Sequence, residues 1–218
     1  MKFYYLHGFA SGPESFKALY FKDEIRKRYK TKLVIPNLNT PSFEKMTITS
    51  QVNYVSELIE QETDKVTIFG SSLGALVSLL IEEKYPDKIE ALVLLAPAFD
   101  FYSRFREKLS EENINHWKAS NQLSFPHYYY EENRLLEFAF YNDSQKYENY
   151  QLSIKTPTIA IHGYQDETIP FGIPNKYLSN KENVTLKFIN DDHSLKKSLP
   201  LITRLIFDFI NINKMIKA

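Results

Sequence analysis

The chain has 218 residues, and its 27 Lys and Arg residues balance its 27 Asp and Glu residues, so the formal net charge is zero. A neutral chain lacks the basic excess typical of nucleic-acid-binding proteins, and we expect no nucleic-acid partner. The sequence contains no cysteine, which excludes disulfides, thiol nucleophiles and cysteine-ligated metal sites.

Short apolar runs alternate with longer amphipathic stretches along most of the chain. In chain order they predict a strand at 3–6, a helix at 15–28, a strand at 33–35, a helix at 48–60, a strand at 66–69, a helix at 73–84, and strands at 91–95 and 158–161, followed by a helix at 171–178, a strand at 184–189 and a helix at 195–212. Most strand runs are apolar without alternation, as in parallel strands covered on both faces. The pattern therefore predicts an α/β sandwich with a mostly parallel sheet.

The regular alternation stops between residues 98 and 150, where aromatic residues are dense. This stretch predicts a helix at 103–117 and a hairpin with strands at 127–130 and 135–141, turning at 131–133. We expect residues 1–97 and 151–218 to form the core domain, and residues 98–150 to form a lid over the carboxyl edge of the sheet. Alternatively, some of the aromatic side chains only pack the insertion onto the core.

A glycine-rich pentapeptide, Gly70-Ser71-Ser72-Leu73-Gly74, lies between the strand at 66–69 and the helix at 73–84. The G-x-S-x-G spacing in a strand–turn–helix setting is typical of a nucleophile elbow, whose tight turn needs glycine two places before and after the serine. The spacing selects Ser72 as the nucleophile and leaves Ser71 a supporting role. By itself, the pentapeptide would also fit an ordinary strand-to-helix loop.

A serine nucleophile needs a base, and the base needs an acid that fixes its tautomer. His193 follows the strand at 184–189, and Asp166 follows the strand at 158–161, so both should lie at the same sheet edge as Ser72. The order Ser72, Asp166, His193 is the one found on α/β-hydrolase sheets. The weaker candidates are Glu167 and Asp143 as the acid, His7 and His162 as buried loop-holding residues, His116 and His127 as surface or packing residues, and Asp191 and Asp192, which are too close in sequence to His193.

The oxyanion of an acyl-transfer intermediate needs two backbone donors. We expect these to be the amides of Leu73, directly after the nucleophile, and Phe9, in the glycine-containing loop after the first strand. The predicted substrate pocket is lined by Phe9, Phe99, Phe101, Tyr102, Phe125, Tyr128 and Ile169.

The chain resembles the YqiA/YcfP-type small esterases of the α/β-hydrolase superfamily. The resemblance rests on four motifs: Tyr5-Leu6-His7-Gly8-Phe9-Ala10-Ser11-Gly12-Pro13, the elbow pentapeptide, Leu95-Ala96-Pro97-Ala98, and His162-Gly163-Tyr164-Gln165-Asp166-Glu167-Thr168-Ile169-Pro170. Within the insertion, Trp117-Lys118-Ala119-Ser120 is similar to bacterial members with a longer middle segment. The resemblance implies a cofactor-free carboxylic ester hydrolase with a Ser-Asp-His triad, on a sheet of about six strands that lacks the first two of the full fold. Ala75 departs from the glycine of many relatives, without an expected loss of function.

We therefore expect a serine esterase that acts on small acyl esters, and thioesters could follow the same path. The alternatives are an acyltransferase that uses the same triad, and a non-catalytic binding protein with this fold. We expect no metal and no cofactor. Residues 1–6 are too short for a signal-peptide core, and no window approaches the roughly 18 apolar residues of a membrane span, so we expect a cytoplasmic protein without stable membrane insertion.

Overall fold

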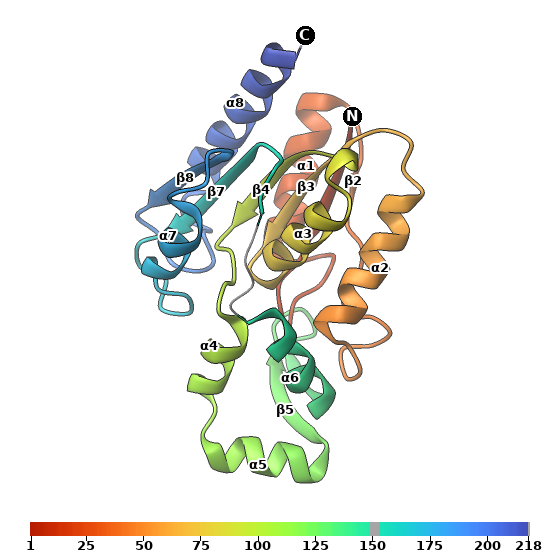
Figure 1. The fold of residues 1–218 in the computed structure, drawn as a ribbon, viewed down its shortest axis with the longest axis vertical. Coiled ribbons are helices and arrows are strands. Elements are labelled where there is room, and N and C mark those ends of the chain that lie inside the picture. Colours follow the sequence, from red (N-terminus) through yellow and green to blue (C-terminus); the bar gives the residue numbers. More distant parts are fainter. Residues whose placement is uncertain (149–152, 218) are drawn as a thin grey trace.

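The computed structural model describes residues 1–148 and 153–217. Six parallel strands form one sheet in the order β2-β1-β3-β4-β7-β8 (Figure 1). They are β1 (Lys2–Leu6), β2 (Leu33–Val34), β3 (Val66–Ser71), β4 (Ile89–Leu95), β7 (Thr158–Gly163) and β8 (Val184–Ile189). Every residue of β3 and β7 is buried, because helices cover both faces of the central strands. The predicted parallel α/β sheet of six strands is confirmed.

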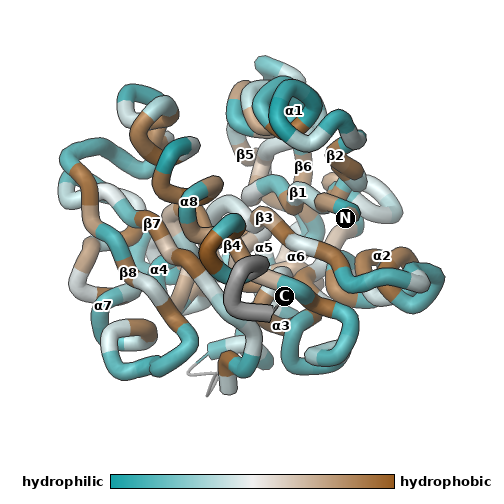
Figure 2. Tube along the Cα trace, turned by 90° about the horizontal axis from the view of Figure 1, so that it is seen from above, coloured by the Kyte–Doolittle hydropathy of each residue, from teal (hydrophilic) through white to brown (hydrophobic). Residues whose placement is uncertain are grey.

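Helices lie on both faces of this sheet, as Figure 2 shows from above. On one face, α1 (Phe16–Tyr29) and α8 (Leu199–Lys217) pack against Phe3 and Tyr5 of β1. On the other face, α2 (Ile48–Glu60), α3 (Leu73–Lys84) and α7 (Gly172–Leu178) contribute to a second core cluster that includes Tyr4 and Leu6 of the same strand. Successive side chains of a strand point to opposite faces, so β1 contributes to both halves of the core.

The strand order reverses direction at β1. The chain runs outward from β1 to β2 and then returns past β1 to pair with it again through β3. Right-handed crossovers in opposite directions place α1 and α2 on opposite faces of the sheet. The loops after β1 and β3 therefore diverge at the carboxyl edge, and such a reversal is where open α/β sheets bind their ligands.

The segment between β4 and β7 lies below the carboxyl edge of the sheet in Figure 1. Its elements are α4 (Phe101–Lys108), α5 (Glu111–Ser120), the antiparallel hairpin β5 (Gln122–His127) and β6 (Glu132–Glu137), α6 (Phe138–Ser144) and the short helix η2 (Gln145–Tyr147); a further short helix, η1 (Pro86–Lys88), precedes β4. Trp117 and Phe140 of this segment are buried together with Leu73 and Leu76 of α3. The end of the predicted insertion, at 150/151, lies outside the described residues.

The predicted helix at 103–117 is wrong in length, because the chain forms two helices there. Leu109 has extended backbone angles that end α4. Ser110 then caps α5, because its hydroxyl accepts a hydrogen bond from the Asn113 amide at 3.1 Å.

The predicted hairpin exists with different strands. Residues 122–127 pair with residues 132–137, and residues 138–144 form α6 instead of the end of a strand. Residues 128–130 are all tyrosine, which favours strands, but they form the tip of the hairpin. Of the three rings, that of Tyr129 packs over Gly12, as described below.

The last helix begins at Leu199 rather than at residue 195. Leu195 has a left-handed backbone (φ 57°), which a helix cannot continue through. Asp191 instead accepts the Ser198 amide at 2.8 Å and closes the loop before the helix. Among the described residues, no helix combines the length and apolar character needed to cross a membrane.

Candidate active site

Ser72 lies at the tight turn between β3 and α3, with a strained backbone at φ 53° and ψ −117°. A β-carbon on Gly70 would lie 2.6 Å from Cα of Ala75, and one on Gly74 would lie 2.6 Å from the carbonyl oxygen of His7. Both positions therefore need glycine, as in a nucleophile elbow. The turn leaves Ser72 partly exposed at the carboxyl edge of the sheet, at the amino end of α3.

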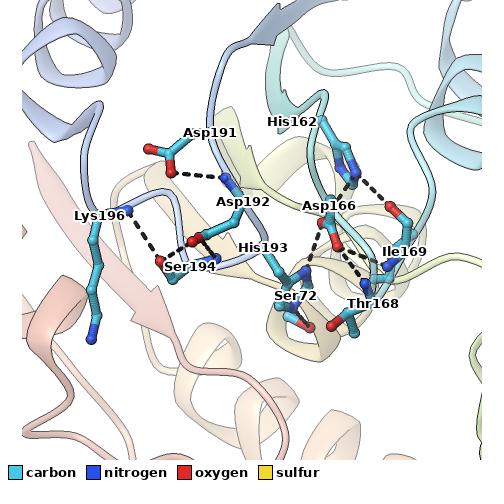
Figure 3. Close-up of polar contacts among 10 residues, drawn as sticks. All are labelled: Ser72, His162, Asp166, Thr168, Ile169, Asp191, Asp192, His193, Ser194 and Lys196. Atoms are coloured by element: carbon cyan, nitrogen blue, oxygen red, sulfur yellow. Dashed lines mark hydrogen bonds and ion pairs between the residues drawn. The ribbon is translucent and has the colours of Figure 1, made fainter.

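The side chains of Ser72, His193 and Asp166 form one hydrogen-bonded chain (Figure 3). Nε2 of His193 lies 3.1 Å from the Ser72 hydroxyl, and Nδ1 lies 2.7 Å from Oδ2 of Asp166. Asp166 is fully buried, whereas 27% of the His193 side chain is exposed. In this arrangement Nδ1 carries the proton donated to Asp166, and the lone pair of Nε2 faces the serine.

Asp166 is held as a carboxylate by three hydrogen-bond donors and a neighbouring imidazole. Oδ1 accepts the amides of Thr168 and Ile169, at 2.9 and 2.8 Å. Oδ2 accepts a hydrogen bond from Nδ1 of His193, and Nε2 of His162, which donates to the carbonyl of Ile169 at 2.8 Å, lies 3.2 Å from the same oxygen. Burial alone would raise the pKa of Asp166, but the hydrogen bonds from His162, His193 and the Ile169 amide lower it well below its usual range.

The loop that carries His193 is fixed by its own carboxylates. Asp191 accepts the Asp192 amide at 2.8 Å, and Asp192 accepts both the amide and the hydroxyl of Ser194 (Figure 3). These side chains bind backbone and hydroxyl groups and do not contact the imidazole. A β-carbon on Gly163 would lie 2.8 Å from the backbone of Asp191, so glycine there lets the loops after β7 and β8 meet.

Residues 8–12, which we call the oxyanion loop, lie beside the nucleophile. A β-carbon on Gly8 would lie 3.2 Å from Cβ of Ser72. Among the described residues, the Phe9 amide donates no hydrogen bond. The Leu73 amide is at the first position of α3, where an amide has no partner within the helix. Neither predicted donor therefore has a hydrogen-bond partner among the described residues.

The Phe9 ring is surrounded by five other rings at centroid distances of 5.3 to 6.2 Å. This Phe9 cluster consists of Phe9, Phe43, Phe101, Phe105, Phe125 and Phe140. The sequence analysis singled out Phe9, Phe101 and Phe125 and missed the other three. Phe101 and Phe105 are one helical turn apart, a spacing that could have identified Phe105. Phe43 and Phe140 carry no comparable signal.

Three of the predicted pocket residues lie elsewhere. Tyr128 is 80% exposed at the hairpin tip. Phe99 stacks on Tyr177 of α7, with centroids 4.8 Å apart, because β4 ends on that face of the sheet. Tyr102 packs against Tyr141, with ring centroids 4.9 Å apart. Ile169 is buried, and its backbone holds Asp166 and His162.

The remaining candidates do not contact the Ser72 hydroxyl. His7 accepts the Leu38 amide at Nε2 (2.9 Å), and burial lowers the pKa of His7 from 6.5 to about 4. Asp143 accepts the Thr49 amide at the start of α2, and Glu167 is exposed. His116 is exposed on α5 and His127 is buried at the end of β5. Within the described residues, no three His, Asp or Glu side chains form a group that could hold a metal ion.

A family model with the description "Uncharacterised protein family (UPF0227)" matches residues 2–210 of this chain. A Mycoplasma genitalium protein named "Putative esterase/lipase 2" is 26% identical over 238 residues, covering 95% of this chain and 87% of that protein.

Two solved structures extend the comparison. The alpha/beta hydrolase domain-containing protein 10 from mouse matches with a TM-score of 0.77 and 18% identity, over 96% of this chain and 89% of the mouse chain. Est1E from Butyrivibrio proteoclasticus, solved with bound ferulic acid, matches with a TM-score of 0.78 and 19% identity, over 98% of this chain and 89% of Est1E. The fold expected from the sequence motifs, that of the α/β hydrolases, is confirmed.

Proposed function

We propose that this chain, which belongs to the UPF0227 family, is a serine hydrolase that cleaves carboxylic esters. The observation that carries the proposal is the hydrogen-bonded chain from Ser72 through His193 to Asp166. The strained elbow also supports it, because a binding protein would need neither the backbone strain at Ser72 nor the two glycines around it. The similarity to a Mycoplasma protein named as an esterase/lipase supports the same reaction class.

The reaction follows from the positions of these atoms. Nε2 of His193 takes the proton of the Ser72 hydroxyl as the serine oxygen bonds to the ester carbonyl carbon. The amides of Phe9 and Leu73 stabilise the oxyanion. The intermediate collapses, the bond to the alkoxy oxygen breaks, and His193 returns its proton to the leaving alcohol. Water, deprotonated by His193, then attacks the acyl-enzyme carbon, the bond to the Ser72 oxygen breaks, and His193 returns the proton to that oxygen as the acid leaves.

Asp166 stays ionised throughout this cycle. Because its hydrogen bonds hold its pKa well below the usual range, it remains a carboxylate at neutral pH. The carboxylate fixes the Nδ1 proton of His193 and stabilises the imidazolium that forms during attack. A thioester would react by the same steps, with a thiol leaving in place of the alcohol.

The acyl group of the substrate is proposed to bind against the Phe9 cluster. Phe9 supplies both a predicted oxyanion donor and a ring in the centre of the cluster, so the reacting carbonyl and the aromatic surface are linked by a single residue. Apolar rings favour an apolar acyl chain.

The test is a panel of p-nitrophenyl esters from acetate to palmitate, with the wild type, Ser72→Ala and the exposed-site control Ser124→Ala. We expect the wild type and Ser124→Ala to hydrolyse esters at equal rates and Ser72→Ala to fall to background. Hydrolysis by Ser72→Ala at the wild-type rate would refute the proposal. Product analysis with added alcohols separates hydrolysis from acyl transfer, because a transferase would form a new ester in place of the acid.

A further inference from the structure

The tip of the β5–β6 hairpin lies directly on the oxyanion loop, although more than 100 residues separate them in the sequence. The amide of Tyr128 donates a hydrogen bond to the carbonyl of Ala10 at 3.0 Å. The Tyr129 ring covers Gly12, since a β-carbon on Gly12 would lie 2.6 Å from two atoms of that ring. The Tyr129 hydroxyl continues to the carboxylate of Glu14, at 3.1 Å.

A second contact joins the same two segments through Asn39. Its side-chain amide donates to the carbonyl of Ser11 at 2.9 Å and lies 3.5 Å from Nε2 of His127, the last residue of β5. His127 is buried, with ring centroids of Phe43 and Tyr130 each 4.5 Å away. Ala10, Ser11 and Gly12 are thus each held by the hairpin, directly or through Asn39.

This loop needs support, because its backbone is unfavourable by itself. Ala10 has a left-handed backbone (φ 51°) although it carries a side chain, and it is buried. Such a conformation persists only where the surroundings hold it. Ala10 directly follows Phe9, so the conformation of Ala10 helps to set the position of the Phe9 backbone.

We propose that the hairpin of the insertion positions the oxyanion loop, with the contact between Tyr129 and Gly12 as its main support. Tyr129 is thus a positioning residue that acts through Gly12 and Ala10 on the Phe9 amide, without touching the substrate. Glycine is needed at position 12 because the ring occupies the place of a β-carbon. The inference rests on the proposed function, since it assigns the Phe9 amide an oxyanion to bind.

The test is a double-variant cycle on the full chain with Gly12→Ala, Tyr129→Ala and the combined variant. The matched control is Tyr128→Ala, which removes a neighbouring ring that is 80% exposed and keeps the backbone amide. We expect kcat to fall about tenfold or more in Gly12→Ala, because one oxyanion donor is worth about 100-fold or more in rate. Tyr129→Ala should lose roughly three- to tenfold in kcat. The combined variant should stay within about threefold of Tyr129→Ala, since the new methyl group fills the space of the missing ring.

The pattern of changes in kcat, KM and inhibitor affinity distinguishes a positioning role of Tyr129 from a merely structural one. Displacement of the Phe9 amide lowers kcat and leaves KM within about threefold, because the oxyanion forms only in the transition state. A trifluoromethyl ketone, whose bound form carries an oxyanion, should bind more weakly to Gly12→Ala by the same factor as kcat falls. Lower melting temperatures with wild-type kcat in both single variants, or a combined variant that loses the product of the two single effects, would overturn the proposal.

Hydrogen exchange tests the support without any substrate. Tyr129→Ala should speed amide exchange in residues 8–12 and leave residues 73–76 of α3 unchanged, whereas Tyr128→Ala should change neither segment. If the wild type hydrolyses no ester, the proposed function fails, and this readout still decides whether the hairpin holds the loop. If amide exchange in residues 8–12 is the same in Tyr129→Ala and the wild type, the hairpin does not support the oxyanion loop, even if the protein is an active esterase.

Discussion

Nδ1 of His193 lies 2.7 Å from Oδ2 of Asp166, although the two residues are 27 positions apart and lie in loops after different strands. Adjacent parallel strands β7 and β8 bring these loops together, since their carboxyl ends lie at the same edge of the sheet. Nε2 of His162, near the end of β7, lies 3.2 Å from the same oxygen of Asp166. The acid is therefore oriented by the His193 imidazole and the amides of Thr168 and Ile169 before any substrate binds.

A fluorophosphonate probe should label Ser72 and no other serine. Only a serine with an adjacent base reacts with such a probe at an appreciable rate, and Ser72 has Nε2 of His193 at 3.1 Å. Peptide mapping by mass spectrometry locates the adduct, and Ser72→Ala should remain unlabelled. An adduct on Ser71 or Ser11, or labelling that survives in Ser72→Ala, would refute the assignment.

Substitutions of the other two triad residues should be nearly as damaging as the loss of Ser72. We expect His193→Ala to lose about 10⁴-fold in kcat, and Asp166→Asn to lose a comparable or smaller factor, because triad residues act as a unit and an amide would stabilise the wrong tautomer. Glu167→Gln is the matched control, since this neighbouring carboxylate is exposed. Near-normal activity in Asp166→Asn, together with an inactive Glu167→Gln, would mean that Glu167 is the acid.

The stability of the fold should decrease as the pH falls from about 6.5 to 4, partly through His7. Burial lowers the pKa of His7 to about 4 in the folded state, whereas the unfolded chain keeps the ordinary value of 6.5. As the pH falls, the unfolded state therefore binds the proton first. The contribution of His7 to the free energy of unfolding is fully present above pH 6.5. Between pH 6.5 and 4 it falls by about 1.4 kcal/mol per pH unit, roughly 3 kcal/mol in total.

Urea unfolding between pH 7.5 and 4 measures this contribution of His7. His7→Gln, whose side-chain oxygen can accept the Leu38 amide, should reduce the dependence of the free energy of unfolding on pH. His116→Gln, at an exposed histidine, should leave it unchanged. If the free energy of unfolding has the same slope against pH in the wild type and His7→Gln, folding does not lower the pKa of His7.

Alanine should be tolerated at Gly172 and not at Gly74. A β-carbon on Gly74 would meet the backbone oxygens of Leu6 and His7, and backbone cannot yield as a side chain can. We expect Gly74→Ala to lose about 3 kcal/mol or more in the free energy of unfolding, or to fail to fold. A β-carbon on Gly172 would have no neighbour within 4 Å, and Gly172→Ala should gain up to about 1 kcal/mol. Equal urea midpoints for the two variants would contradict this account of the elbow.

Catalytic efficiency should increase from acetate towards medium-chain esters and then decrease. Each methylene buried against the Phe9 cluster is worth about 0.8 kcal/mol, or up to roughly fourfold per carbon. Phe105→Ala should shift the optimum to longer chains, because it removes a ring that packs 5.5 Å from Phe9. Tyr128→Ala, at the exposed tip, should not shift it. A profile that is highest at acetate in the wild type would mean that the cluster packs only internally and binds no acyl chain.

Much of the core followed from the sequence, because the signals involved are local. Continuous apolar runs mark strands that are buried on both faces, and all six were predicted within two residues at each end. The elbow is recognised by a pattern of five consecutive residues, although a β-carbon at Gly74 would clash with the distant backbone of Leu6 and His7. Parallel strands share one carboxyl edge, so the positions of Asp166 and His193 after separate strands were enough to predict that both would lie near Ser72.

The surroundings of the Phe9 ring were decided only by the tertiary structure. Residues 98–148 have no continuous periodicity, and their helices and hairpin take positions set by contacts with distant segments. Tyr128 and Tyr129 are neighbours of the same type, yet one is exposed and the other covers Gly12. No local pattern separates them, because the choice depends on where a backbone 117 positions earlier passes within reach of a ring.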